Sequence, residues 1–200
     1  MALNLDWLRK YMLVLRVRGV PVYVHWSVPA LAIFILGVGV ERILIVGAAV
    51  VAYLAMLAIH ELGHQLVAQW RGYQVNRIEL NPFHARCWLD HPEGQLDASL
   101  IASGGVVAQW LVALPFIGYR LVFGYTPYEP INAFIAILGF LSPGVAMFNL
   151  LPVAPLDGKK AWSFFPLLWR RWRFSHRSRQ HEQTAAEIFQ EIAEKRKRRK

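Results

Sequence analysis

Four apolar stretches that are nearly free of charge constrain this chain most strongly. The stretch from Ile43 to Trp70 contains a single formally charged residue, Glu61. About 20 consecutive apolar residues in a helix cross a hydrocarbon core of ~30 Å. We therefore expect membrane-spanning helices, and the four stretches cover residues 20–40, 43–70, 98–122 and 131–151. The third stretch begins near Ser-Gly-Gly at 103–105, small residues that favour close approach of a neighbouring helix.

The distribution of positive charge favours a membrane protein over a nucleic-acid-binding one. The net charge is +9, yet thirteen of the 22 Lys and Arg residues lie between Lys159 and Lys200, and four more between Arg9 and Arg18. No base-reading module is apparent, and the basic ends lack interleaved aromatic residues, so no nucleic-acid partner is expected. The positive-inside rule indicates a multi-pass protein of the cell membrane with both termini cytoplasmic. The single Cys87 excludes an internal disulfide and a multi-cysteine metal site.

These patterns predict an all-α polytopic membrane protein with about four transmembrane helices, a short membrane-associated β-hairpin or loop, and interfacial helices at both ends. Residues 1–19 mix apolar and basic side chains and are expected to form an amphipathic segment on the membrane surface. Residues 20–158 form the expected transmembrane core, and residues 159–200 an interfacial helix and a basic cytoplasmic tail. Within residues 71–97, imperfect alternation and a turn signal at Asn81-Pro82 predict one or two short strands.

The second apolar stretch contains His60-Glu61-Leu62-Gly63-His64, which matches the pattern H-E-x-x-H. On a helix, His60 and His64 lie at i and i+4 on one face, a spacing at which two imidazoles can hold one zinc ion. Glu61 is then placed to take a proton from a zinc-activated water. An ionisable residue in such an apolar helix is costly and is a functional candidate by default, although this short pattern also occurs by chance on packed helices.

Catalytic zinc commonly has three protein ligands, so the two histidines require a third from elsewhere in the chain. The fourth apolar stretch ends in residues 149–158, NLLPVAPLDG, whose two prolines cannot continue a helix. Asp157 is the only carboxylate there, and a zinc ion would offset its charge; alternatively, it caps the turn before Gly158. Asn149 is a candidate amide donor to the substrate or to an oxyanion, or it caps backbone groups beside Pro152.

The combination of HELGH in an apolar helix with the later NLLPVAPLDG resembles the site-2 protease family of intramembrane zinc metalloproteases. The pair of motifs is far more specific than H-E-x-x-H alone. The resemblance implies a zinc site formed by His60, His64 and Asp157. It also implies that Glu61 is catalytic and that Asn149 assists the substrate.

The resemblance covers roughly residues 20–158. Residues 20–27, VPVYVHWS, are similar to the opening of that family's first helix. Two departures stand out. The family often has Gly-Pro-x-x-Asn where this chain has Gly105 to Gln109, which leaves the role of Gln109 open. It usually has a Gly-Gly turn where this chain has Pro-Phe-His-Ala at 82–85. No PDZ or CBS regulatory module is expected within 200 residues.

Four further residues carry side chains of metal-binding type without an assigned role: His25, His84, Cys87 and His91. His25 lies near the start of the first apolar stretch, where a capped or interfacial histidine is the simpler interpretation. The other three lie in the polar insertion. They could form a secondary metal site, but solvated loop side chains are the simpler interpretation.

The favoured hypothesis is an intramembrane zinc endopeptidase that cleaves transmembrane segments of membrane-anchored proteins, as in regulated intramembrane proteolysis. A helix hides its peptide bonds, so a substrate would have to unwind locally before water attacks. The expected partners are a substrate transmembrane helix and the lipid bilayer. Two alternatives remain open, a membrane metal transporter and a non-catalytic relative that binds helices without cutting. Transport needs no water-activating base, so Glu61 argues against the first, and the intact motif disfavours the second.

Overall fold

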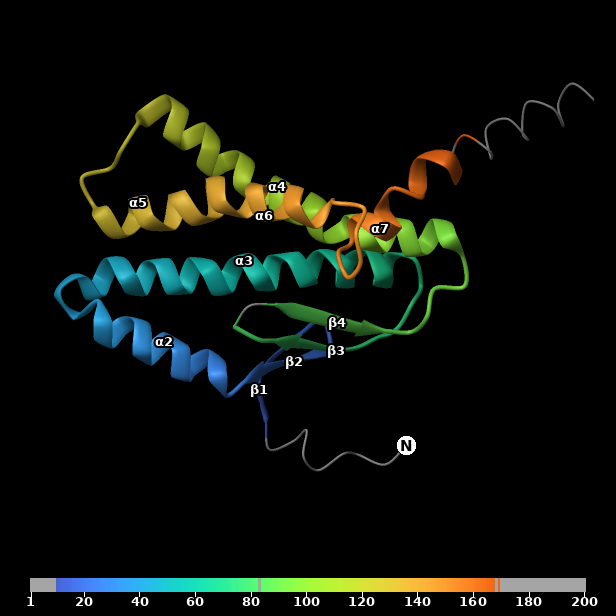
Figure 1. The fold of residues 1–200 in the computed structure, drawn as a ribbon, viewed down its shortest axis with the longest axis horizontal. Coiled ribbons are helices and arrows are strands. Elements are labelled where there is room, and N and C mark those ends of the chain that lie inside the picture. Colours follow the sequence, from blue (N-terminus) through green and yellow to red (C-terminus); the bar gives the residue numbers. More distant parts are fainter. Residues whose placement is uncertain (1–9, 83, 168, 170–200) are drawn as a thin grey trace, which may run out of the picture. The chain divides into compact units, whose positions relative to one another are not determined.

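The computed structural model describes residues 10–82, 84–167 and 169 (Figure 1). The chain divides into two compact units, Met1–Trp162 and Ser163–Lys200, and every element labelled in Figure 1 belongs to the first. In the second unit, residues 164–167 are helical. Most of the interfacial helix and basic tail predicted for residues 159–200 lies outside the described residues.

Three helices are long and apolar enough to cross a membrane, judged by length and composition. The first is α3 (Ile43–Trp70), which follows the short 3-10 turn η1 (Val40–Arg42). The second is α4 (Gln95–Phe123). The third is assembled from α5 (Glu129–Ile135), the π-helical segment η2 (Ala136–Leu141) and α6 (Ser142–Asn149). These helices correspond to the second, third and fourth stretches predicted from the sequence.

The helix predicted over residues 20–40 is only partly present. Val20–His25 form the strand β2, and the helix that follows, α2 (Ser27–Val38), has 12 residues. At ~1.5 Å per residue α2 is about 18 Å long, which is short of a ~30 Å hydrocarbon core. Within the described ranges three helices therefore reach spanning length, and a fourth is not confirmed. The strand forms because the branched side chains of Val20 and Val22 alternate into a buried core.

The strand β1 (Tyr11–Val17) lies within the amphipathic segment predicted near the N-terminus, and with β2 it extends the predicted hairpin to a four-stranded sheet, so the all-α prediction is wrong for residues 11–25. The strand order is β1-β2-β3-β4, with β3 (Val75–Leu80) and β4 (Ala85–Leu89). The pairs β1–β2 and β3–β4 are antiparallel, and β2–β3 is parallel. Arg18 and Gly19, with φ of 50° and 84°, form the tight turn that folds β1 back onto β2. Residues 1–9 of the predicted segment lie outside the described residues.

The sheet packs against the half of α3 that carries the H-E-x-x-H motif. Its buried core consists of Val20, Val22, Ile78 and Leu80, and Ala58 and Leu62 of α3 pack against it. The hairpin predicted within residues 71–97 is present as β3 and β4. The sheet thereby fixes the side of α3 that faces away from α4.

Helices α3 and α4 approach closely at a pair of glycines. A Cβ atom added to Gly104 would lie 2.5 Å from the carbonyl oxygen of Gly63 and 2.9 Å from Cγ2 of Val67. No larger residue fits at either glycine without separating the helices. The close approach predicted from the small residues at 103–105 is therefore observed, and it brings the α4 backbone against the motif.

Candidate metal centre

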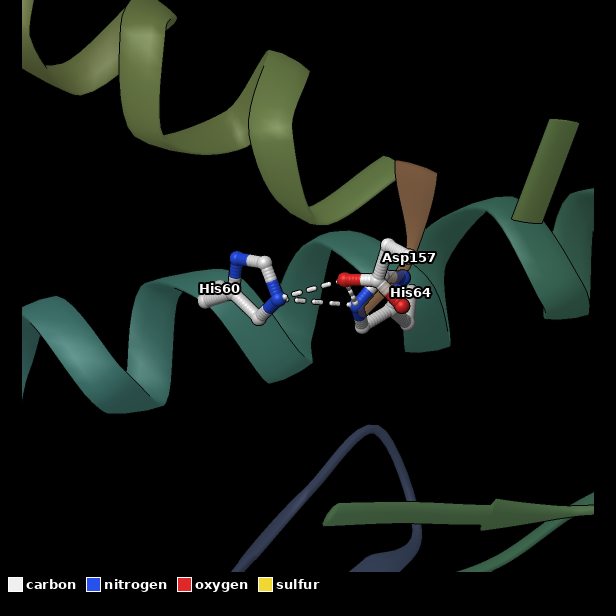
Figure 2. Close-up of side chains that lie close together, drawn as sticks. All are labelled: His60, His64 and Asp157. Carbon is white, nitrogen blue, oxygen red and sulfur yellow. Dashed lines mark hydrogen bonds and ion pairs between the residues drawn. The ribbon is translucent and has the colours of Figure 1, made fainter. Parts of the chain in front are cut away.

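His60 and His64 lie one turn apart on α3 and project from the same face of the helix (Figure 2). Both are buried, with 8% and 7% of their surface exposed, and Glu61 between them is 5% exposed. The i, i+4 spacing brings their Nε2 atoms to 3.1 Å of each other. The helix thus presents two imidazole nitrogens to one point inside the protein.

Asp157 reaches the same point from the irregular segment between α6 and α7 (Gly158–Ala161). Its Oδ2 lies 3.0 Å from Nε2 of His60 and 3.2 Å from Nε2 of His64 (Figure 2). The Asp157 side chain forms no capping hydrogen bond with α7, so the turn-capping alternative is not observed. The indole N–H of Trp162 donates to the carbonyl of Leu150 at 2.6 Å, which ties together the two ends of this segment.

The two imidazoles are oriented by hydrogen bonds on their far sides. Nδ1 of His64 lies 2.7 Å from the carbonyl oxygen of Ile101, an atom that only accepts, so this nitrogen carries a proton. Nδ1 of His60 lies 2.9 Å from Oε1 of Gln109 and donates to it in the same way. In the neutral tautomer that results, each Nε2 presents a lone pair toward the other ring and toward the Asp157 carboxylate.

This arrangement of donors fits a metal cation, because three lone-pair atoms converge without a hydrogen between them. Adjacent ligands of a tetrahedral zinc ion with bonds of about 2.0–2.1 Å lie about 3.3 Å apart. The three separations here, 3.0, 3.1 and 3.2 Å, are close to that value. The donor set therefore has the composition and size of a zinc site with three protein ligands.

The two groups that orient the imidazoles, the Gln109 amide and the Ile101 carbonyl, could not be identified from the sequence. Gln109 is fully buried and was left without a role because it stands at a departure from the resembled motif. Its contact with His60 explains why an amide rather than an apolar side chain occupies that position in α4. The Ile101 carbonyl has no sequence signal at all, because every residue carries one. Only the packing of α4 on α3 selects it.

Gly105 forms the floor beneath both imidazoles. A Cβ atom at this position would lie 2.7 Å from Cε1 of His60, 2.7 Å from Nε2 of His64 and 2.8 Å from Nδ1 of His60. These distances are shorter than van der Waals contact, so only glycine leaves room for both rings in their present places. The sequence indicated a small residue here for helix packing, and the structure adds the histidine rings as the second reason.

The Glu61 carboxyl is buried near the backbone of Cys87 in β4 as well as near the two histidines. Burial, and to a smaller extent the charge of Glu61, raise the pKa of the Cys87 thiol to about 12. Such a thiol stays protonated and is a poor metal ligand.

The remaining candidates are not brought to the centre. His84 and His91 are exposed in the polar insertion, and among the described residues the one group of metal-binding side chains is His60, His64 and Asp157. Nδ1 of His25 accepts from the backbone N–H of Ser27, with 3.2 Å between the two nitrogens, at the start of α2. Asn149 is the last residue of α6 and is half-buried. No hydrogen bond in the described part of the chain joins its side chain to any of the three candidate ligands.

Comparisons with known proteins bear on the sequence and on the overall fold. No family model matches the chain. Over 107 residues, 52% of the chain, it is 34% identical to a Synechocystis protein named "Putative zinc metalloprotease sll0528". The match spans only 27% of that relative's length.

Among solved structures, the chain is similar to a site-2 protease from Methanocaldococcus jannaschii. The TM-score is 0.62, and the match covers 76% of this chain and 69% of that one at 20% identity. The fold is that of a site-2 protease. The described residues contain three long apolar helices, one fewer than the four predicted from the sequence.

Proposed function

We propose that this protein is an intramembrane zinc endopeptidase that cleaves transmembrane segments of membrane-anchored proteins, as in regulated intramembrane proteolysis. The observation that carries the proposal is the convergence of His60, His64 and Asp157 at one point. The two histidines and the buried Glu61 lie on α3, a helix of membrane-spanning length. The similarity to a named zinc metalloprotease and to a site-2 protease structure supports the same reading.

The three ligands and Glu61 have separate roles in this reaction. A bound zinc ion makes water acidic enough to attack a peptide carbonyl near neutral pH. His60, His64 and Asp157 hold the ion, and Gln109 and the Ile101 carbonyl keep the two rings turned toward it. Glu61 accepts the proton of the attacking water and passes it to the leaving nitrogen as the C–N bond breaks. Asn149 is proposed to assist the substrate.

The substrate must meet this site in an extended conformation, because the peptide bonds of an intact helix are shielded by their own hydrogen bonds. The strand β4 ends the sheet on the side that reaches Glu61, through Cys87. An extended segment beside β4 would bring its carbonyl groups close to the ligands. The proposed partners are therefore a locally unwound transmembrane segment and the surrounding bilayer.

The decisive test replaces Glu61 with glutamine. In liposomes that contain single-span membrane proteins as substrates, Glu61→Gln should retain zinc but lose cleavage by about 10²–10⁴-fold, the usual contribution of a general acid–base. Glu41→Gln is the matched control, since Glu41 is an exposed carboxylate in η1, away from the three ligands. Cleavage at the wild-type rate in Glu61→Gln would exclude the assigned role. Zinc movement across the vesicle membrane in the same variant, without cleavage by wild type, would favour a transporter.

A further inference from the structure

Arg120 carries a buried donor that has no acceptor in the structure. It lies in the last turn of α4, eleven residues beyond Gln109, and therefore about 16 Å further along the helix. Its Nη1 atom is buried and forms no hydrogen bond within the described residues, and none of their ion pairs includes it. Leaving a buried guanidinium N–H unpaired costs free energy, so an acceptor is expected at this place.

A cavity of about 320 Å³ adjoins this arginine. It is lined by Arg120, Tyr125, Asn132, Ile135, Ala136 and Phe140. The other polar side chains in its lining are those of Asn132 and Tyr125. The Asn132 amide is used within the turn, where Nδ2 donates to the Thr126 carbonyl at 2.8 Å and Oδ1 accepts from the Thr126 backbone N–H at 2.9 Å. The Arg120 guanidinium lies over the Tyr125 ring. The Asn132 side chain is thus held by the turn, and the cation in the lining is the Arg120 guanidinium.

The position of the cavity along α4 indicates what kind of anion reaches it. With 29 residues, α4 is about 43 Å long, as long as a bilayer of about 40–45 Å with its headgroups. The last turn of such a helix lies at headgroup depth. Tyr125 and Tyr128 are exposed beside it, and tyrosine is enriched at this interface. Phosphate is the anion that a bilayer presents at this depth.

We propose that this cavity binds the phosphodiester group of a membrane phospholipid, with the Arg120 guanidinium donating to its oxygens. Arginine suits this ligand because its planar fork forms two parallel hydrogen bonds to a phosphate. The site lies at the end of α4 away from the candidate metal centre, and it does not depend on the proposed protease activity.

The test uses the full chain, delipidated in detergent and titrated with short-chain phosphatidylglycerol while Tm is followed. Two further probes separate the sources of binding. Dihexanoyl glycerol has acyl chains without phosphate, and inorganic phosphate has no acyl chains. Arg120→Gln removes the guanidinium group and its positive charge, and Arg42→Gln is the matched control, because Arg42 is an exposed arginine in η1 outside the cavity.

We expect phosphatidylglycerol to raise the Tm of the wild type and of Arg42→Gln, and its affinity to fall by about tenfold or more in Arg120→Gln. Without lipid, Arg120→Gln loses an unpaired buried N–H and also the contact with the Tyr125 ring, so the lipid-induced rise in Tm is measured from the lipid-free Tm of each variant. If Arg120→Gln does not fold, Arg120→Lys should bind more weakly than wild type, since it keeps the charge but lacks the fork. Equal affinity in wild type and the Arg120 variants would overturn the proposal. An equal response to dihexanoyl glycerol would also do so, and an equal Arg120-dependent response to inorganic phosphate would overturn the lipid assignment.

Discussion

Replacing Gly105 with alanine inserts one methyl group between the backbone of α4 and the two imidazoles. The new Cβ would lie 2.7 Å from the nearest atom of each ring, where ordinary contact begins at 3.4 Å. Something must therefore move by about 0.7 Å to restore contact distance. Separating the helices instead would break the close packing of Gly104 on Gly63. We expect the rings to be displaced.

A displacement of that size is large for a metal site, whose ligand distances are normally kept within about 0.2 Å. Comparable disturbances around metal ligands lower affinity by about 10–100-fold. Gly105→Ala should therefore lose zinc to a chelator at a correspondingly lower chelator concentration. Alanine is about 1 kcal/mol more favourable than glycine inside a helix, so the helical content of α4 should not fall.

The assay is zinc content by elemental analysis of the purified protein after dialysis against graded chelator, with circular dichroism as the check on folding. Gly118→Ala is the matched control, since it is the same substitution in the same helix and no atom lies within 4 Å of its Cβ. The control should keep wild-type zinc affinity. A Gly105→Ala protein that is folded and holds zinc as tightly as Gly118→Ala would refute the geometry described for the two rings.

Three further substitutions test the remaining parts of the site and the orientation. Asp157→Asn should lower zinc content and abolish cleavage while the protein still inserts, and normal zinc with normal cleavage would remove Asp157 from the ligand set. Gln109→Leu should lower zinc affinity by about 10–100-fold in the chelator assay because His60 loses its orienting acceptor, whereas Gln109→Glu should restore much of it. If residues 20–40 cross the membrane as the first of four spans and both termini are cytoplasmic, a cysteine at Gly39 should react with an impermeant thiol reagent in intact cells. Labelling only after the membrane is breached would contradict that topology, and the native Cys87, with its pKa near 12, should give little background.

The three candidate ligands could be proposed from the sequence because each depends on a local or a chemical rule, and the structure brings their side chains together. His60 and His64 share a face through helical periodicity alone. Asp157 was a candidate because an isolated carboxylate in an apolar region needs a cation, and the structure places it beside the histidines. Gln109 differs, because its role depends on how α4 rotates against α3. One sequence contains no record of that rotation.

The two N-terminal strands, β1 and β2, were not predicted from the sequence for a related reason. A segment that mixes apolar and basic side chains is compatible with an amphipathic helix at an interface and with a strand at the edge of a sheet. The choice depends on partners, and β2 pairs not only with its neighbour β1 but also with β3, about 50 residues later. The one local sign of a hairpin in the sequence was Gly19, which with Arg18 adopts the positive φ of the tight turn. Once β2 is a strand, the apolar stretch that remains, α2, is too short to span.

The route by which Asp157 joins the centre also bears on how the fold and the ion depend on each other. His60 and Asp157 are 97 residues apart in the chain, and they come from different segments of the first unit. The segment carrying Asp157 is anchored to α4 by the Ser99 hydroxyl, which donates to the Ala161 carbonyl at 2.8 Å. Without a cation, Asp157 contacts the two imidazoles directly, with Oδ2 at 3.0 and 3.2 Å from their Nε2 atoms. A bound cation would be held jointly by His60, His64 and Asp157. The free energy of metal binding would then also stabilise the contact between α3 and the segment that carries Asp157. The centre therefore closes the fold across its longest sequence separation, and the glycines at 63, 104 and 105 make that closure sterically possible.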